Sequence, residues 1–107
     1  MLLIIEKKGT PIAETRLAHG TLTLGRSRKV DIRIDHPTVS NRHAKVVTIF
    51  GASYIEDLDS LNGTFVNDKK IHMHTLHHGD EVRLGSADIV LRVEDTAEEA
   101  KELSREA

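Results

Sequence analysis

The chain has 107 residues, which is enough for one compact domain and too few for two. Hydrophobic residues make up 38% and charged residues 30%, and the formal net charge is −2 with the seven histidines counted as neutral. This balance gives no general reason to bind nucleic acid or an anionic membrane. The absence of cysteine excludes disulfides, thiolate nucleophiles and thiolate metal ligands. We expect a soluble, cytoplasmic, monomeric domain.

The N-terminal segment is apolar only from Leu2 to Ile5 and is followed at once by Glu6 and two lysines. A signal peptide requires a basic region before a longer apolar one, so this segment is predicted to be a first strand. No apolar run in the chain approaches the length of a membrane span.

Short β-rich segments separated by turn residues follow one another along most of the chain. In chain order these are Leu2–Glu6, Pro11–Leu17, Thr21–Leu24, Asp31–Ile34, His43–Phe50, Ala52–Leu58, Thr64–Val66, Glu81–Leu84 and Ala87–Val93. Thr21–Leu24 and Asp31–Ile34 alternate polar and apolar residues, the period of a half-buried strand, and Gly51 separates two strands as a hairpin turn. The regular spacing predicts an all-β fold, an antiparallel sandwich or barrel.

The C-terminal segment differs in composition from the rest. Thr96 and Glu99 match a helix capping box, and Ala97, Ala100 and Leu103 form a weak apolar stripe. A helix this short is marginal without tertiary contacts. We therefore expect a domain over residues 1–94 and a helical tail or linker over residues 95–107.

Three polar loops adjoin predicted strands, at Leu24–Lys29, Val39–Ala44 and Asp57–Asn67. Loops on a rigid scaffold are the usual place for binding groups. The first two loops supply four cations, a hydroxyl and an amide, from Arg26, Arg28, Lys29, Arg42, Ser40 and Asn41. A phosphate monoester carries close to two negative charges and three acceptor oxygens, which a guanidinium fork and hydroxyl or amide donors can satisfy.

The third loop contains Asn62 followed by Gly63, a strong turn dipeptide because both residue types tolerate positive φ. The Asn62 side chain has a donor and an acceptor, as needed to bond a peptide backbone. The three loops together predict a site for a phosphorylated peptide.

Four blocks of residues occur in a defined order: Gly25-Arg26, Val39-Ser40-x-x-His43-Ala44, Asp57-Leu58-x-Ser60-x-Asn62-Gly63-Thr64-x-Val66-Asn67 and Gly79-Asp80-x-Val82-x-Leu84-Gly85. Their order and spacing resemble the forkhead-associated (FHA) domain family over roughly residues 1–94. The resemblance implies an antiparallel β-sandwich of eleven strands that binds phosphothreonine peptides through the loops joining its strands.

The resemblance also implies roles for individual residues. Arg26 and Ser40 would contact the phosphate, and Asn41 would help to hold the peptide or phosphate. Asn62 would bond the peptide main chain. From their charge rather than from the resemblance, Arg42, Arg28 and Lys29 are expected to form a basic rim, for which simple solvated charge is an equal alternative.

Leu61 departs from the family pattern, because many members have a serine, threonine or lysine at its position that adds a phosphate contact. Leucine can offer only its backbone there. Gly25, His43 and Gly63 would shape the loops rather than touch the ligand.

Histidines raise two further possibilities. His43 stands three residues after Ser40, but no third group orients it as a base, so a buried histidine bonded to loop backbone is favoured over a catalytic one. A second group comprises His72, His74, His77 and His78. All-histidine sites bind zinc or nickel, yet this stretch corresponds to a surface turn of the family, so a solvated cluster is favoured over a metal site.

The sequence thus predicts a non-catalytic module for phosphothreonine-dependent recognition of proteins or peptides in kinase signalling, with no cofactor, nucleic-acid or membrane partner. Two alternatives stay open. One is an interaction domain on the same fold that binds partners without phosphate, and the other is a hydrolase or metal enzyme built on the histidines.

Overall fold

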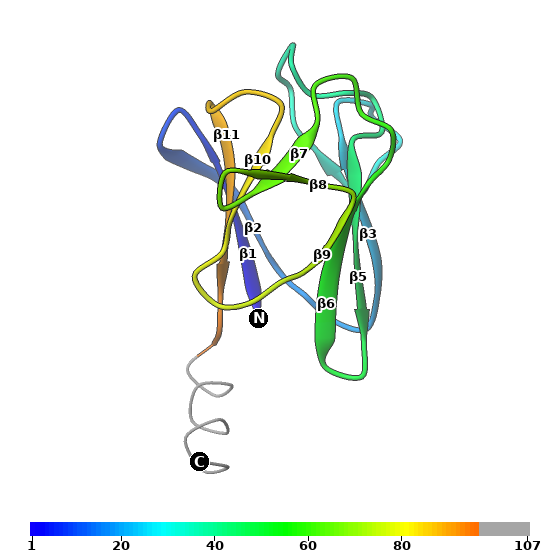
Figure 1. Cartoon of the computed structure of the whole chain (residues 1–107), viewed down its shortest axis with the longest axis vertical. Helices are drawn as coiled ribbons and strands as arrows, with labels where there is room; N and C mark the ends of the chain where they lie inside the picture. The colour runs from blue at the N-terminus through cyan, green and yellow to red at the C-terminus, as the bar shows by residue number, and fades with distance from the viewer. Residues whose placement is uncertain (97–107) are drawn as a thin grey trace.

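The computed structural model describes residues 1–96, which contain eleven β-strands (Figure 1). The strands are β1 (Leu2–Lys7), β2 (Thr10–Arg16), β3 (Gly20–Gly25), β4 (Ile32–Arg33), β5 (Ala44–Ile49), β6 (Ala52–Asp57), β7 (Thr64–Val66), β8 (Lys69–Ile71), β9 (Met73–Thr75), β10 (Glu81–Leu84) and β11 (Ile89–Glu94). Within these residues there is no helical segment of the length and hydrophobicity that a membrane span requires. The tail helix expected after Thr96 lies outside the described residues.

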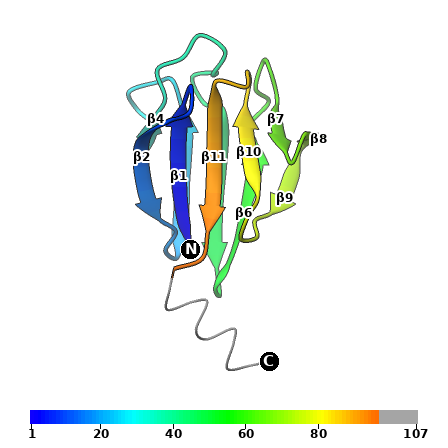
Figure 2. The same cartoon turned by 90° about the vertical axis from the view of Figure 1, so that its left-hand side faces the viewer.

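The strands form two sheets that face each other as a sandwich (Figures 1 and 2). One sheet has the order β2-β1-β11-β10-β7-β8 and the other the order β4-β3-β5-β6-β9. The predicted β-sandwich is therefore confirmed. The pairing is antiparallel except between β3 and β4, which run parallel over two residue pairs.

The core between the sheets consists of aliphatic side chains from alternate positions of the long strands. Leu3 and Ile5 of β1 are fully buried, and so are Ile89, Leu91 and Val93 of β11. This spacing of two explains why these segments form strands, since every second side chain reaches the core. Because the strands supply the apolar side chains of the core that holds the two sheets together, the connecting loops can carry polar residues.

The β5–β6 hairpin contains the turn that the sequence predicted at Gly51. Phe50 and Gly51 are the two residues between the strands, with φ of 50° and 77°. Positive φ at both central positions is the geometry of a type I′ turn, whose twist matches that of paired strands.

The edge strands β8 and β9 were not predicted, and the interpretation of residues 72–78 as a surface turn was wrong in part. Met73–Thr75 form β9, which pairs with β6 through Tyr54↔Thr75 and Ile55↔His74. Both strands have three residues and expose most of their side chains, so they show no apolar alternation that a sequence pattern could reveal.

Three loops lie together at one end of the sandwich, the upper end in Figure 1. They are the β3–β4, β4–β5 and β6–β7 loops, which contain the polar segments singled out in the sequence. The β5–β6 hairpin lies at the opposite end.

Candidate functional site

The end of β3 packs directly against the β4–β5 loop. The Arg26 amide donates to the Ser40 carbonyl at 3.0 Å, and the Ser27 amide donates to the Asn41 carbonyl at 3.2 Å. A Cβ atom at Gly25 would overlap the carbonyl oxygen of Asn41, so only glycine allows this approach. The close contact places Arg26 beside Ser40, as a shared phosphate ligand would require.

His43 joins the β4–β5 loop to the β6–β7 loop from inside the protein. The ring is fully buried; its Nδ1 accepts a hydrogen bond from the Ser40 amide at 3.1 Å, and its Nε2 lies 2.8 Å from the Gly63 carbonyl. Because Nδ1 accepts, the proton of the neutral ring must reside on Nε2, which donates to Gly63. Burial lowers the pKa of His43, although the Gly63 carbonyl and the Asp57 carboxylate act in the opposite direction. This geometry supports a loop-structuring role.

The Ser40 hydroxyl is held by the backbone of Leu61. The Leu61 amide donates to Ser40 Oγ at 2.9 Å, while the Leu61 side chain is 88% exposed. A hydroxyl oxygen that accepts one bond still has its own proton to donate. Ser40 can therefore donate that proton to an anion in front of the loops.

Asn62 bridges the β6–β7 and β4–β5 loops. Its Nδ2 donates to the Thr38 carbonyl at 2.9 Å. Its Oδ1 has no hydrogen-bond donor among residues 1–96. The sequence assigned both ends of this amide to a peptide, whereas the structure uses Nδ2 internally, so that only Oδ1 is available to a ligand.

Asp57 organises the β6–β7 loop at the end of β6. Its Oδ1 accepts from the hydroxyls of Ser60 at 2.5 Å and Thr64 at 2.7 Å, and its Oδ2 accepts from the Ser60 amide at 3.1 Å. Burial raises the pKa of Asp57, but hydrogen bonds from Ser60 and Thr64 and the nearby His43 outweigh it and hold that pKa below the usual value. The carboxylate fixes the turn that presents Asn62.

Sequence reasoning missed His36, which anchors the β4–β5 loop to the β10–β11 turn. On one side of the ring, Nδ1 lies 2.8 Å from Thr38 Oγ1 and accepts a hydrogen bond from the Thr38 amide at 3.2 Å. On the other side, Nε2 lies 3.1 Å from Asp88 Oδ2. The Ser86 amide also donates to Thr38 Oγ1, at 3.2 Å. The side chain is only 10% exposed, a position that no local pattern around His36 indicates.

Five of the six residues predicted to bind phosphopeptide line one shallow pocket of about 190 Å³. They are Arg26, Ser40, Asn41, Leu61 and Asn62, accompanied by Pro37, Thr38 and Val39. Arg42, the sixth, lines a neighbouring hollow with Asn41, Ser27, Lys29, Thr23 and Val30. The two pockets share Asn41, so the predicted residues form one continuous surface.

The cations around this pocket have no acidic partner. Arg26, Arg28, Lys29 and Arg42 are exposed, and none of the four forms an ion pair within the described part of the chain. Basic groups without internal partners around a pocket lined by hydroxyl and amide groups are suited to an anion such as a phosphate monoester.

The sequence profile of the FHA domain matches residues 22–85. The chain belongs to the FHA domain family. Among curated relatives, the glycogen accumulation regulator GarA of Mycolicibacterium smegmatis is 39% identical over 90 residues, which cover 82% of this chain and 56% of the relative. The oxoglutarate dehydrogenase inhibitor of Corynebacterium diphtheriae is 36% identical over 89 residues, which cover 83% of this chain and 62% of the relative. This FHA chain thus spans less than two thirds of their length.

Solved structures agree with the family assignment. An FHA domain from a structural and functional analysis of phosphothreonine-dependent FHA domain interactions superposes with a TM-score of 0.75 at 26% identity, covering 90% of this chain and 100% of that domain. The two relatives above are named as a regulator and an inhibitor, not for a catalysed reaction. This agrees with the prediction that the FHA domain described here is not an enzyme.

Proposed function

We propose that this FHA domain recognises phosphothreonine in partner proteins and acts in kinase signalling. The observation that carries the proposal is the pocket in which Arg26, free of any ion pair in residues 1–96, adjoins the Ser40 hydroxyl and the Asn62 amide. The relation to an FHA domain studied for phosphothreonine-dependent interactions supports the same ligand.

Each polar group in the pocket has a part in the proposed complex. The Arg26 guanidinium pairs with two phosphate oxygens, and the Ser40 hydroxyl donates to phosphate while its oxygen stays bonded to the Leu61 amide. Asn62 Oδ1 accepts a hydrogen bond from the peptide main chain next to the phosphothreonine. Asn41 and Arg42, on the side of the second hollow, contact the peptide or add positive potential.

A phosphothreonine peptide library, followed by calorimetry on the best sequence, tests the proposal. Matched peptides carrying threonine, phosphothreonine or phosphoserine at the same position are titrated into the full chain. We expect tight binding only with phosphate present, and a preference for phosphothreonine. One buried methyl contributes about 1 kcal/mol, so the preference over phosphoserine from burial alone is modest.

Arg26→Ala should weaken phosphopeptide binding by at least about tenfold, because a charge-assisted hydrogen bond contributes about 1.5–3 kcal/mol. Arg16→Ala is the matched control, since Arg16 is exposed at the end of β2, outside the three loops. Equal binding of phosphorylated and bare peptides, or an Arg26→Ala variant as tight as Arg16→Ala, would instead support phosphate-independent recognition on the same fold.

The proposed partners also suggest where the protein works. Kinases that phosphorylate threonine need ATP, so we place the interaction in the cytoplasm. Fractionation of cells that produce the protein with an epitope tag tests this, and recovery of the protein outside the cytoplasmic fraction would contradict it.

A further inference from the structure

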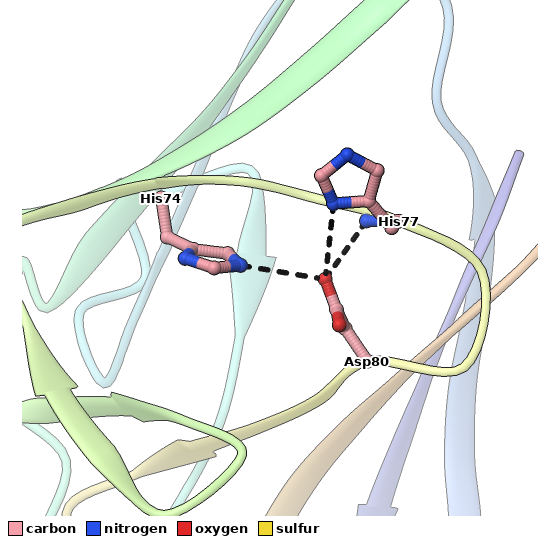
Figure 3. A group of neighbouring side chains, drawn as sticks. All are labelled: His74, His77 and Asp80. Atoms are coloured by element: carbon pink, nitrogen blue, oxygen red, sulfur yellow. Dashed lines mark hydrogen bonds and ion pairs between the residues drawn. The ribbon is translucent and has the colours of Figure 1, made fainter.

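Two histidines and one carboxylate meet where β9 leads into β10 (Figure 3). His74 belongs to β9, His77 to the following loop, and Asp80 directly precedes β10. His74 Nε2 lies 3.6 Å and His77 Nδ1 3.9 Å from Asp80 Oδ2, and the three ligand atoms all lie within 4.8 Å of one another. The sequence grouped His74 and His77 with His72 and His78. His72 lies instead toward Glu56, with Nε2 3.9 Å from its Oε1.

The spacing is close to that of a tetrahedral zinc site. Bonds of about 2.0–2.2 Å from zinc to nitrogen or oxygen place neighbouring ligand atoms about 3.3–3.6 Å apart in a tetrahedron. The distance of 3.6 Å from His74 to Asp80 lies at the upper end of that range, and the distance of 3.9 Å from His77 to Asp80 exceeds it by roughly 0.3 Å. The side chain of His77 is 72% exposed, so its ring is free to rotate toward His74 and close the remaining gap.

The carboxylate of the group is already oriented by the protein. Asp80 Oδ1 accepts a hydrogen bond from Asn67 Nδ2 at 2.9 Å, and Oδ2 accepts from the His77 amide at 2.8 Å. The Asp80 side chain is only 12% exposed. Hydrogen bonds of this kind hold a metal ligand in place and are part of how proteins build metal sites.

We propose that His74, His77 and Asp80 form a binding site for a divalent transition-metal ion such as Zn²⁺, with water completing the coordination. Two imidazoles and one carboxylate are a donor set that suits zinc, nickel and copper rather than magnesium or calcium. The sequence favoured a solvated cluster at this place because the stretch corresponds to a surface turn of the family. The structure adds Asp80 as a third ligand beside His74 and His77.

The location indicates what the ion would do. β9 belongs to the five-stranded sheet and β10 to the six-stranded sheet, so an ion bound by His74 and Asp80 would link the two sheets. An ion that binds the folded state and not the unfolded chain stabilises the fold. The site is separate from the phosphopeptide pocket, with which it shares no residue, so we expect a structural rather than a ligand-binding effect.

Calorimetric titration of ZnCl₂ into the full chain, after dialysis against chelator and in a buffer that does not bind zinc, tests the site. We expect saturable binding of one ion and a higher melting temperature with zinc. His74→Ala and His77→Ala should each reduce zinc affinity by at least about tenfold, the loss expected when part of a metal site is removed. His72→Ala is the matched control, because His72 is an equally exposed histidine of the same segment outside the cluster.

Melting of each variant in chelator shows that it is folded before zinc is added, and His77→Ala removes only an exposed side chain. Two outcomes would overturn the proposal. One is the absence of saturable zinc binding by the wild-type chain. The other is an equal loss of affinity in His72→Ala and His77→Ala, which would mean adventitious binding by surface histidines.

Discussion

The backbone amide of Leu61 donates a hydrogen bond to the side-chain oxygen of Ser40 at 2.9 Å, across 21 positions of the sequence. This bond leaves the Ser40 proton as the donor available to a ligand. It also explains how the site accommodates leucine where many family members have a polar residue. Residue 61 contributes to the site through its backbone N–H group, which every residue except proline possesses.

The contrast between Ser40 and Leu61 gives a first prediction. Ser40→Ala removes the proposed phosphate donor and the acceptor of the Leu61 amide, so phosphopeptide affinity should fall by about tenfold, the effect of one lost hydrogen bond to a charged group. Leu61→Ala keeps the amide and should bind almost as the wild type does. Calorimetry with one phosphothreonine peptide measures both, and a larger loss from Leu61→Ala than from Ser40→Ala would refute this division of roles.

His43→Ala should leave the part-buried Ser40 amide and the buried Gly63 carbonyl without their partner. We expect the fold to be destabilised by on the order of 1–3 kcal/mol. Chemical unfolding monitored by circular dichroism measures the loss. His78→Ala is a control at an exposed histidine. An unchanged stability with abolished peptide binding would show that His43 belongs to the ligand contacts.

The buried ring of His43 also predicts how stability depends on pH. Burial lowers the pKa of His43 below its ordinary value of 6.5, so the unfolded chain binds this proton more tightly than the folded one. Stability should therefore be fully present above about pH 6.5 and decline as the pH falls from there to the lowered pKa of the folded state.

Denaturant titrations at several pH values test this slope, with His43→Gln as the comparison because glutamine does not titrate. The difference in unfolding free energy between wild type and His43→Gln should shrink as the pH falls below about 6.5. A difference that stays constant across this range would mean that protonation of His43 is not coupled to folding.

His36 should influence peptide binding without touching the ligand. His36→Ala breaks the bonds to Thr38 and Asp88 that hold the β4–β5 loop, so both thermal stability and phosphopeptide affinity should decrease. Asp88→Ala should show part of the same loss, and the double variant should lose less than the sum of the two single variants. Additive losses would show that the contact between His36 and Asp88 does not hold the loop.

Local features of the sequence were sufficient to predict the long strands and the types of residue that form the site. In Thr21–Leu24 the alternation of polar and apolar residues reports a strand with one buried face, because side chains of a strand alternate between its two faces. Asn62 next to Gly63 is likewise interpretable from neighbouring residues, since the positive φ of Gly63 uses a backbone freedom that belongs to glycine itself. Gly25 differs, because glycine is needed there for the approach of the Asn41 carbonyl.

Only the tertiary structure decided which distant groups meet. The contact between His36 and Asp88 joins residues 52 positions apart, and the approach of His74 to Asp80 depends on β9 pairing with β6. Such contacts follow from strand register and from the packing of the two sheets, which no short window of sequence contains. The short edge strand β9 escaped prediction for the same reason: its backbone bonds to β6 hold it in place, and its own side chains show no buried face.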